Sequence, residues 1–260
     1  MNEQKTVDDK VRATVGVVVY NTAMETLEAT LGCLLKSEPK VRVIILCNSP
    51  LAEYQRDIAN LAKRFGVDLL ANRPNDGFGA GHNTIVKAVT SEWYVCCNPD
   101  AFVNPETINK LISFGSSAAD SVLIGPRIYN LDGSIQLLAR KHITIANWVH
   151  RQLWRHFPKV FSPAEIRFDY EMTQRAEFVS GAFFAVRVEH YRALGGFSED
   201  YFLYCEDADL ARRACDLGSN YYVADAWLTH GWSRAWQHSW RHISHELRSL
   251  LRYFRKFGFY

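Results

Sequence analysis

The sequence predicts an α/β protein with a mostly parallel central sheet and helices on both of its faces. Apolar, β-branched runs alternate with stretches of helical period, which is the order that βαβ crossover units require. The 260 residues are 48% hydrophobic and 22% charged, as in globular proteins large enough to bury such a core. These figures exclude disordered, collagen-like and coiled-coil chains.

The first hundred residues supply four strands and the helices between them. Leu27, Leu31 and Leu34 recur at helical spacing, and two further helical stretches end near Phe65 and Val89. Turn residues follow each apolar run and mark its end. The predicted strands are 15–20, 41–47, 67–70 and 93–97.

The second half departs from this alternation. Pro105 suits the first turn of a helix, and residues 131–134 have the composition of a hairpin turn after a short strand at 122–124. Residues 140–175 show no clean period, which indicates a long, partly helical insertion over one end of the sheet. The remaining predicted elements are a strand at 178–186 and helices at 188–194 and 207–217, each helix ended by glycine.

Residues 232–260 form a predicted basic amphipathic helix. From residue 230 to the end, six Lys or Arg residues stand against a single acid, Glu246, which gives this segment a charge of +5. Such a helix lies on an anionic membrane, packs on its own domain or forms a dimer interface. Its apolar side contains Trp236, Trp240, Ile243, Leu247, Leu250, Leu251, Phe254 and Phe257.

The charge balance and the cysteines limit the kinds of binding partner and the cellular compartment that the sequence allows. Thirty Lys and Arg against 28 Asp and Glu leave a net charge of +2, which is too small for a surface devoted to nucleic acid. The six cysteines form no CxxC pair and no zinc-finger spacing, which indicates reduced thiols. Because no apolar run has the length of a membrane span and the first residues are polar, we expect a cytoplasmic protein, at most peripheral on the inner face of the cytoplasmic membrane.

Asp100 follows a predicted buried strand, in the tripeptide Asn98-Pro99-Asp100. Open α/β sheets form their ligand crevices at the carboxyl ends of strands. The rigid turn presents one carboxylate, a ligand for a hard divalent cation that leaves other positions to diphosphate oxygens and water. The alternative is a carboxylate that caps the helix near Pro105.

A glycine-rich loop precedes the next predicted helix. It runs from Asn72 to Asn83 and contains Gly77, Gly79 and Gly81. Glycines allow the backbone to approach a ligand closely, and the helix start that follows favours anions. The loop is no P-loop, because no Gly-Lys-Ser/Thr follows it. A simple packing turn is the alternative.

Three carboxylates, Glu206, Asp207 and Asp209, fall at a predicted helix start after the aromatic residues 201–204. A carboxylate kept partly desolvated there is suited to act as a general base. The helix dipole also favours acids at this position, so a purely structural role is the alternative. His230 ends the next strand-like segment, either as a structural residue or as a ligand.

In order along the chain, these motifs resemble those of the family 2 inverting glycosyltransferases of GT-A fold, and most closely their rhamnosyltransferase branch. The resemblance covers roughly residues 15–232, and it is the ordered set of motifs that is specific. The stretches that carry it are Val17-Val-Val-Tyr-Asn21, Cys47-Asn-Ser49, Asn72-x-x-Asn-x-Gly-Phe-Gly-x-Gly-x-Asn83, Asn98-Pro-Asp100, Gly181-Ala182, and Gly195-Gly-Phe-Ser-Glu-Asp-Tyr-Phe-Leu-Tyr-Cys-Glu-Asp-Ala-Asp209 with Arg212 or Arg213 after it.

The resemblance implies a role for each matching residue. Asp207 matches the general base, with Glu206 beside it. Asp100 matches the last acid of an Asp-x-Asp metal motif whose first acid is replaced by Asn98, and His230 matches a late residue near the metal and the diphosphate. The implied cofactor is a divalent metal, Mg²⁺ or Mn²⁺. The residues implied in donor nucleotide binding are Asn21, Asn48, Asn75, Gly77, Phe78, Gly79, Asn83 and Asn98.

The resemblance also implies an activity and an organisation. The donor would be dTDP-L-rhamnose, and the acceptor a lipid-linked or polysaccharide precursor of a cell-surface glycan of O-antigen or capsule type. The alternatives are a transferase with a UDP-hexose or galactofuranose donor, and a sugar-nucleotide-binding protein without catalysis. The expected domain covers 13–231, with a nucleotide-binding half at 13–125 and an acceptor-binding half at 126–231, followed by the helical segment 232–260.

Overall fold

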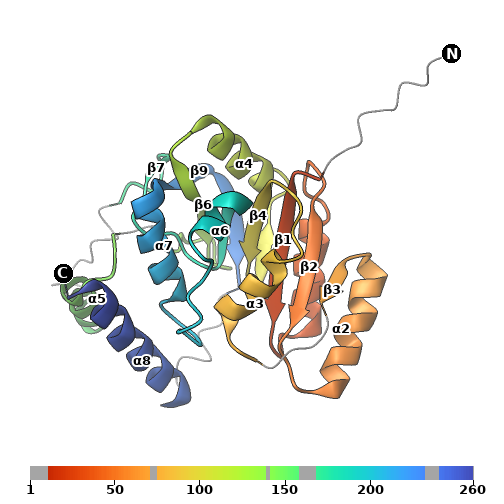
Figure 1. The fold of residues 1–260 in the computed structure, drawn as a ribbon, viewed down its shortest axis with the longest axis horizontal. Helices are drawn as coiled ribbons and strands as arrows, with labels where there is room; N and C mark the ends of the chain where they lie inside the picture. The colour runs from red at the N-terminus through yellow and green to blue at the C-terminus, as the bar shows by residue number, and fades with distance from the viewer. Residues whose placement is uncertain (1–10, 71–74, 139–140, 158–167, 232–239, 260) are drawn as a thin grey trace.

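The computed structural model describes residues 11–70, 75–138, 141–157, 168–231 and 240–259. Its strands form one sheet in the order β3-β2-β1-β4-β8-β6-β9-β5, with β7 paired to β9 (Figure 1). Six strands of this sheet (β1, β2, β3, β4, β6 and β9) run in one direction, and β5, β7 and β8 run against them. The predicted α/β class with a mostly parallel sheet is therefore confirmed.

The elements alternate as predicted in the first half of the chain and less regularly afterwards. The strands are β1 (Ala13–Val19), β2 (Arg42–Cys47), β3 (Asp68–Leu70), β4 (Trp93–Cys97), β5 (Ala101–Val103), β6 (Ser121–Tyr129), β7 (Gln174–Arg175), β8 (Phe183–Arg187) and β9 (Ser219–His230). The helices are α1 (Met24–Leu34), α2 (Ala52–Phe65), α3 (Phe78–Val86), α4 (Thr107–Ser117), α5 (Ile145–His156), α6 (Val188–Ala193), α7 (Glu206–Leu217) and α8 (Trp240–Phe257).

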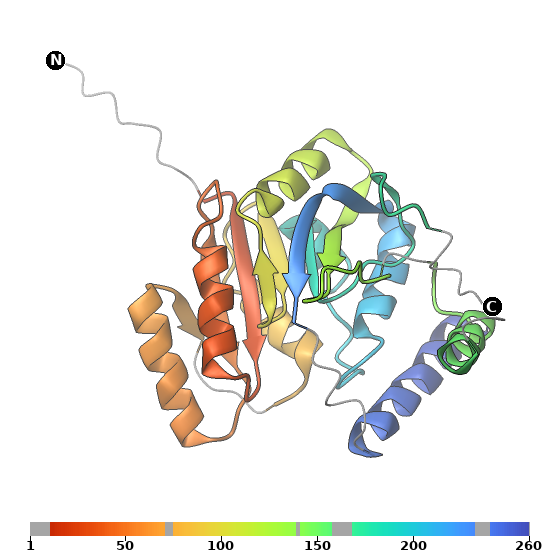
Figure 2. The ribbon, with the colours of Figure 1, turned by 180° about the vertical axis from the view of Figure 1, so that it is seen from behind.

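Helices cover both faces of the sheet because its strands are apolar on both faces. Along β1, Val15 and Val17 belong to a core that also contains residues of α1, α2 and α4, whereas Val18 belongs to a second core with α3, α6 and α7. This is the alternation that a strand period of two residues imposes. Figures 1 and 2 show the two helical layers from opposite sides.

Some predicted boundaries differ from the observed ones. The strand expected at 178–186 begins only at Phe183. Strand β5, which directly follows the Asn98-Pro99-Asp100 turn, was not predicted. The expected boundary between two halves at residue 125 falls inside β6, which is continuous through Ser121–Tyr129. The turn expected at 131–134 is present, because Asn130 N donates to Ser134 O over 2.7 Å.

The C-terminal helix is present, and part of its apolar side packs on its own domain. Leu250, Tyr253 and Phe254 of α8 are buried in the same core as α7, whereas Leu247 and Leu251 are 53% and 48% exposed. Trp236 and the side chains of residues 240–243 lie outside what the structure describes. The predicted apolar stripe is therefore divided between an inner, buried side and an outer, exposed one, and α8 shares a core with the preceding domain.

Candidate functional site

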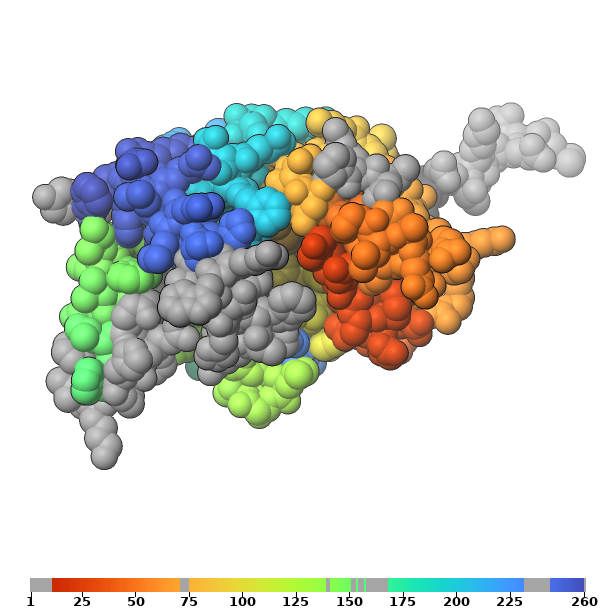
Figure 3. All heavy atoms as spheres, turned by 90° about the horizontal axis from the view of Figure 1, so that it is seen from below, coloured from red at the N-terminus to blue at the C-terminus, as the bar shows by residue number. Residues whose placement is uncertain are grey.

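The parallel strands bring the predicted polar residues to one edge of the sheet. Asn21 follows β1, Asn48 follows β2, Asn98 follows β4, and His230 ends β9. Because these strands run in one direction, their carboxyl ends share an edge. Figure 3 views this edge and shows the surface hollowed between the segments coloured red to orange and those coloured cyan to blue.

The glycine loop reaches this edge and is tied to it from two sides. Gly77 O accepts a hydrogen bond from Asn48 Nδ2 over 3.3 Å, and Gly77 N donates to Asn75 Oδ1 over 3.2 Å. Gly77 has a φ of 105°, and a Cβ there would lie 2.3 Å from the carbonyl oxygen of Phe202. Only glycine fits, and so the loop places the start of α3 against the segment that leads to Asp207. Asn72 lies outside the described residues.

Asp207 lies in the first turn of α7 and faces the segment before β8. Its Oδ2 accepts a hydrogen bond from Gly181 N over 3.0 Å, and its Oδ1 accepts one from Ala208 N over 2.8 Å. A Cβ on Gly181 would lie 3.1 Å from Asp207 Cβ and 3.5 Å from the Phe78 ring. The carboxylate is therefore fixed by backbone N–H groups beside the glycine loop.

Asp100 and His230 form a pair where β5 begins and β9 ends. Asp100 Oδ1 lies 3.1 Å from His230 Nε2, and Asn98 Nδ2 lies 3.2 Å from the same nitrogen. The contact follows from the sheet, because Ala101 pairs with His230 across β5 and β9, and Gly231 N donates to Asp100 O over 2.9 Å. Thr30 of α1 also fixes the turn by donating to Pro99 O over 2.8 Å.

Gln136, which no sequence pattern pointed to, orients the imidazole of His230. Its Oε1 lies 3.2 Å from His230 Nδ1, and its Nε2 donates to His230 O over 3.2 Å. In the tautomer with the ring proton on Nδ1, which Gln136 Oε1 accepts, Nε2 is an acceptor. Two acceptors 3.1 Å apart, Nε2 and Asp100 Oδ1, gain from a cation between them. The pair therefore fits a divalent metal whose other positions are taken by diphosphate oxygens and water.

The described residues contain no cluster of three or more His, Cys, Asp and Glu side chains that would by itself enclose a metal ion. A carboxylate and an imidazole are nevertheless the kind of partial ligand set with which proteins hold a metal on a phosphate substrate. Asp100 and His230, the two predicted metal ligands, lie side by side, and their role in holding a metal stays a prediction.

The two acidic positions are connected through adjacent residues. Gly181 N donates to Asp207, and Ala182 O accepts a hydrogen bond from Asn98 N over 2.9 Å. Asn98 is in turn the residue that contacts His230. Asp100 and Asp207 are 107 residues apart in the sequence. Asp207 contacts the segment before β8 directly, whereas Asp100 is linked to it through His230 and Asn98. That the two acids serve one crevice stays a prediction.

A buried chain of hydrogen bonds supports Gly181 from below. Cys96 Sγ donates to Gly181 O and lies 3.3 Å from His82 Nε2, and His82 Nδ1 lies 2.5 Å from the hydroxyl of Tyr94. Burial lowers the pKa of His82 to about 3, so the ring is neutral. Because the thiol of Cys96 donates its hydrogen to Gly181 O, His82 Nε2 donates to Cys96 Sγ. His82 Nδ1 then accepts from the hydroxyl of Tyr94. His82 and Cys96 were not predicted as site residues, because only the tertiary contacts show this chain.

Asn83, a predicted donor-binding residue, uses both its amide nitrogen and its amide oxygen in contacts within the protein. Nδ2 donates to Phe197 O and to Glu199, at 2.9 and 3.0 Å. Oδ1 accepts from Tyr191 and from Phe197 N, at 2.7 and 2.9 Å. These contacts join α3 to the segment between α6 and α7, which indicates that Asn83 holds the loop in place.

Glu206, next to Asp207, is buried, with a side-chain oxygen, Oε2, that has no hydrogen-bond partner among the described residues. Burial, followed by the neighbouring Asp207, raises its pKa to about 8. At neutral pH Glu206 is therefore mainly a neutral acid. Because Glu206 keeps its own proton, Asp207 is the one of the two adjacent carboxyl groups that is placed to accept a proton.

Replacing Glu206 by Gln is expected to flatten the pH dependence of stability. The folded pKa lies above the unfolded value near 4.5, so the folded state binds the proton more tightly, and wild-type stability falls as the pH rises from about 4.5 to about 8. Glu206→Gln does not show this loss. The difference between its free energy of unfolding and that of the wild type should therefore rise, in favour of the variant, by about 1.4 kcal/mol for each pH unit within that window.

Urea denaturation at several pH values measures this difference. Glu53→Gln, on the exposed part of α2, is the matched control and should follow the wild-type curve. Parallel curves for Glu206→Gln and the wild type would show that Glu206 is charged in the folded protein.

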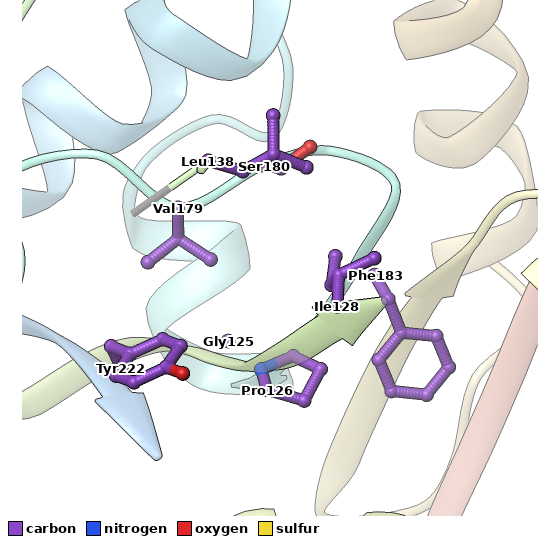
Figure 4. A pocket seen from close by; sticks show the side chains of 8 residues that line it. All are labelled: Gly125, Pro126, Ile128, Leu138, Val179, Ser180, Phe183 and Tyr222. Atoms are coloured by element: carbon purple, nitrogen blue, oxygen red, sulfur yellow. The ribbon is translucent and has the colours of Figure 1, made fainter. Parts of the chain in front are cut away.

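Two cavities lie close to the site without being its main volume. One of about 80 Å³ adjoins Asn48 between β2 and α3, beside the predicted nucleotide position. The other, of about 10 Å³, lies beneath Ser180 (Figure 4), and a space of this size holds at most one water molecule. The second cavity is lined by Gly125, Pro126, Ile128, Leu138, Val179, Ser180, Phe183 and Tyr222.

The sheet order, with the polar strand ends and the acid at the start of α7, defines a protein of GT-A fold. The sequence model of "Glycosyl transferase family 2" matches residues 14–195, more than half of the chain. The chain belongs to this family, as its motifs indicated. The matched region includes the glycine loop, Asn98-Pro99-Asp100 and Gly181, and ends before α7.

Individual relatives agree with this assignment. An N-acetylglucosaminyl-diphospho-decaprenol L-rhamnosyltransferase of Mycobacterium tuberculosis is 28% identical over 181 residues, which cover 63% of this chain and 58% of the relative. The chain thus matches little more than half the length of that protein.

Solved structures share the fold at low identity. GalNAc-T7 with UDP, GalNAc and Mn²⁺ has a TM-score of 0.70 at 14% identity, over 94% of this chain and 48% of that one. The mannosyltransferase PcManGT from Pyrobaculum calidifontis, in complex with GDP-Man and Mn²⁺, has a TM-score of 0.65 at 16% identity, over 94% and 64%.

Proposed function

We propose that the protein is an inverting glycosyltransferase that moves a sugar from a nucleotide diphosphate to a hydroxyl group of a glycan acceptor. One observation carries the proposal: Asp207 and the Asn98, Asp100 and His230 group attach to the adjacent residues Gly181 and Ala182. This attachment supports the proposal that a base and an anion-holding group act beside one position at the sheet edge.

Inversion needs a base on one side of the anomeric carbon and a stabilised leaving group on the other. Asp207 takes the proton of the acceptor hydroxyl as that oxygen attacks, and Gly181 N keeps the carboxylate in place. Asp100 and His230 would hold a divalent metal, which supplies positive charge to the departing diphosphate. The acceptor oxygen forms its bond to the anomeric carbon as the bond to the diphosphate oxygen breaks, so no covalent sugar–enzyme intermediate is required.

The donor we propose is dTDP-L-rhamnose. The support is the matching relative from Mycobacterium tuberculosis, whose name describes an L-rhamnosyltransferase, together with the Asn98-Pro99-Asp100 tripeptide. That relative is also named for a lipid-linked N-acetylglucosamine, so we propose a lipid-linked glycan precursor as the acceptor. A UDP-hexose or a galactofuranose donor is the second candidate, because the structurally similar GalNAc-T7 was solved with UDP.

A lipid-linked acceptor suits a protein that contacts the membrane surface. No helix of the described chain is long and apolar enough to cross a bilayer. The outer side of α8 exposes Leu247 and Leu251 beside Arg248 and Arg252, a combination that favours binding to anionic lipid. Sedimentation with anionic liposomes measures this contact, and protein that stays wholly in the supernatant would exclude it.

A thermal-shift panel of nucleotide sugars tests the function, followed by a transfer assay with the best donor. A ligand that binds only the folded state raises the melting temperature, by an amount that grows with its concentration over the Kd. We expect dTDP-L-rhamnose with Mn²⁺ or Mg²⁺ to give the largest shift among dTDP-, UDP- and GDP-sugars, and to be consumed in the presence of acceptor. A larger shift with UDP-sugars would replace the donor, and the absence of any shift would contradict the function.

A further inference from the structure

We propose that α8 is a positioning element for the turn that presents Asp207, and that Ser249 and Lys256 are its positioning residues. The inference rests on the proposed role of Asp207. It concerns a part of the chain that lies beyond the family match, which ends at residue 195.

The turn before Asp207 needs external support. Tyr204 and Cys205 have φ values of 69° and 64°, and two consecutive non-glycine residues in the left-handed region are strained. Such conformations persist only where neighbouring structure holds them. Glu206 and Asp207 follow directly, so whatever holds this turn also sets the position of the base.

The N-terminal side of the turn is held by the middle of α8. Ser249, which is buried, donates from its hydroxyl to Leu203 O over 2.8 Å. The ring of His245 stacks on Phe202 at 5.1 Å. Phe202 O in turn accepts a hydrogen bond from Phe78 N, the first residue of the helix after the glycine loop. The same contacts therefore connect α8 with the donor side of the site.

The C-terminal side of the turn is held by the last part of α8. Asp209 is fully buried, two residues after Asp207, and its two oxygens lie 2.6 Å from Lys256 Nζ and 2.6 Å from Arg213 Nε. Tyr201 also donates to Asp209, over 3.3 Å. A buried carboxylate needs such partners, and loss of one leaves part of its charge uncompensated. Lys256 thus joins α8 to the first turn of α7.

The apolar side of α8 provides the attachment on which these polar contacts depend. Leu250, Tyr253 and Phe254 are buried between Ser249 and Lys256 and belong to the core of α7. The hydroxyl and the ammonium group therefore act from a fixed helix, one on each side of the strained turn. Removal of either should loosen the position of Asp207 without emptying the core.

Lys256→Met is expected to lower kcat about tenfold or more, with the donor KM within about threefold of wild type, because a small displacement of a catalytic group reduces the transfer step far more than donor binding. Ser249→Ala should act in the same direction, and Lys256→Arg should restore most of kcat by renewing the pair with Asp209. Arg255→Met, at the exposed neighbouring position on α8, is the control and should keep wild-type kcat.

The rates are to be measured well below the melting temperature of each variant, with a water-soluble acceptor analogue so that membrane contact does not enter. Unchanged kcat in both Lys256→Met and Ser249→Ala, even with a lowered melting temperature, would reduce α8 to a structural element and overturn the inference. Failure of the wild type to transfer sugar from any donor would instead contradict the proposed function itself, so the two failures are distinguishable.

Discussion

Asp207→Asn is expected to reduce sugar transfer by a factor of about 10² to 10⁴ and to leave donor affinity unchanged. The asparagine carbonyl can still accept the hydrogen bond that Gly181 N makes to Asp207, although the bond from Ala208 N to the second oxygen is lost. The contact between α7 and the segment before β8 is therefore kept. The amide cannot take the proton of the acceptor hydroxyl. Initial rates and calorimetric titration of the donor, measured on the same preparation, separate the two effects.

Asp216→Asn, at the exposed end of the same helix, is the control for the charge change and should transfer sugar at the wild-type rate. Wild-type turnover by Asp207→Asn would remove Asp207 from the role of base. Loss of donor binding would place Asp207 on the donor side, contrary to the geometry described here.

Asp100→Ala is expected to weaken donor binding by at least about tenfold in the presence of Mn²⁺. Replacing a residue that only hydrogen-bonds to a metal ligand already lowers metal affinity by about that factor, and loss of a ligand itself should cost no less. The wild type should lose affinity when EDTA is added. The variant should bind the donor equally weakly with and without EDTA, because the carboxylate that faces His230 at 3.1 Å is gone. Calorimetric titrations under both conditions measure the change.

Asp225→Ala is the matched control, since Asp225 is an exposed acid on β9, the strand that ends at His230. It should keep the wild-type response to EDTA. An EDTA effect of wild-type size in Asp100→Ala would show that the metal is held elsewhere, and no EDTA effect in the wild type would remove the metal from the account.

The fold could be predicted where local pattern decides it. Strands such as β1 and β2 are apolar on both faces and separated by helical stretches, and this pattern alone favours a parallel sheet. The limits lie where long-range pairing decides. β5 exists because Ala101 to Val103 pairs with the end of β9, and the inner side of α8 is buried because α7 is there to receive it. Neither partner can be read from the segment itself.

The candidate site shows the same division. Asn98 and Asp100 were predicted because strand ends and acids are visible in the sequence, whereas the role of His230 was implied by the family resemblance. The antiparallel pairing of β5 with β9 brings Asp100 and His230 together. Gln136 and Cys96 could not be predicted, because each acts through a contact that only the folded chain makes. Asn83 belongs to a recognisable motif, yet its amide is bound by the segment before α7. Residue type and spacing indicate a site, whereas hydrogen-bond partners distinguish ligand contacts from support.

The central claim is that Asp100 and Asp207 act on opposite sides of one bound donor. A crystal structure of Asp207→Asn with dTDP-L-rhamnose and Mn²⁺ tests it most directly, with the metal located by its anomalous signal. We predict an anomalous peak within about 2.5 Å of an Asp100 oxygen and of the diphosphate, and an anomeric carbon whose open face is turned toward residue 207. A metal and diphosphate remote from Asp100, or a sugar whose open face is turned away from residue 207, would contradict the claim.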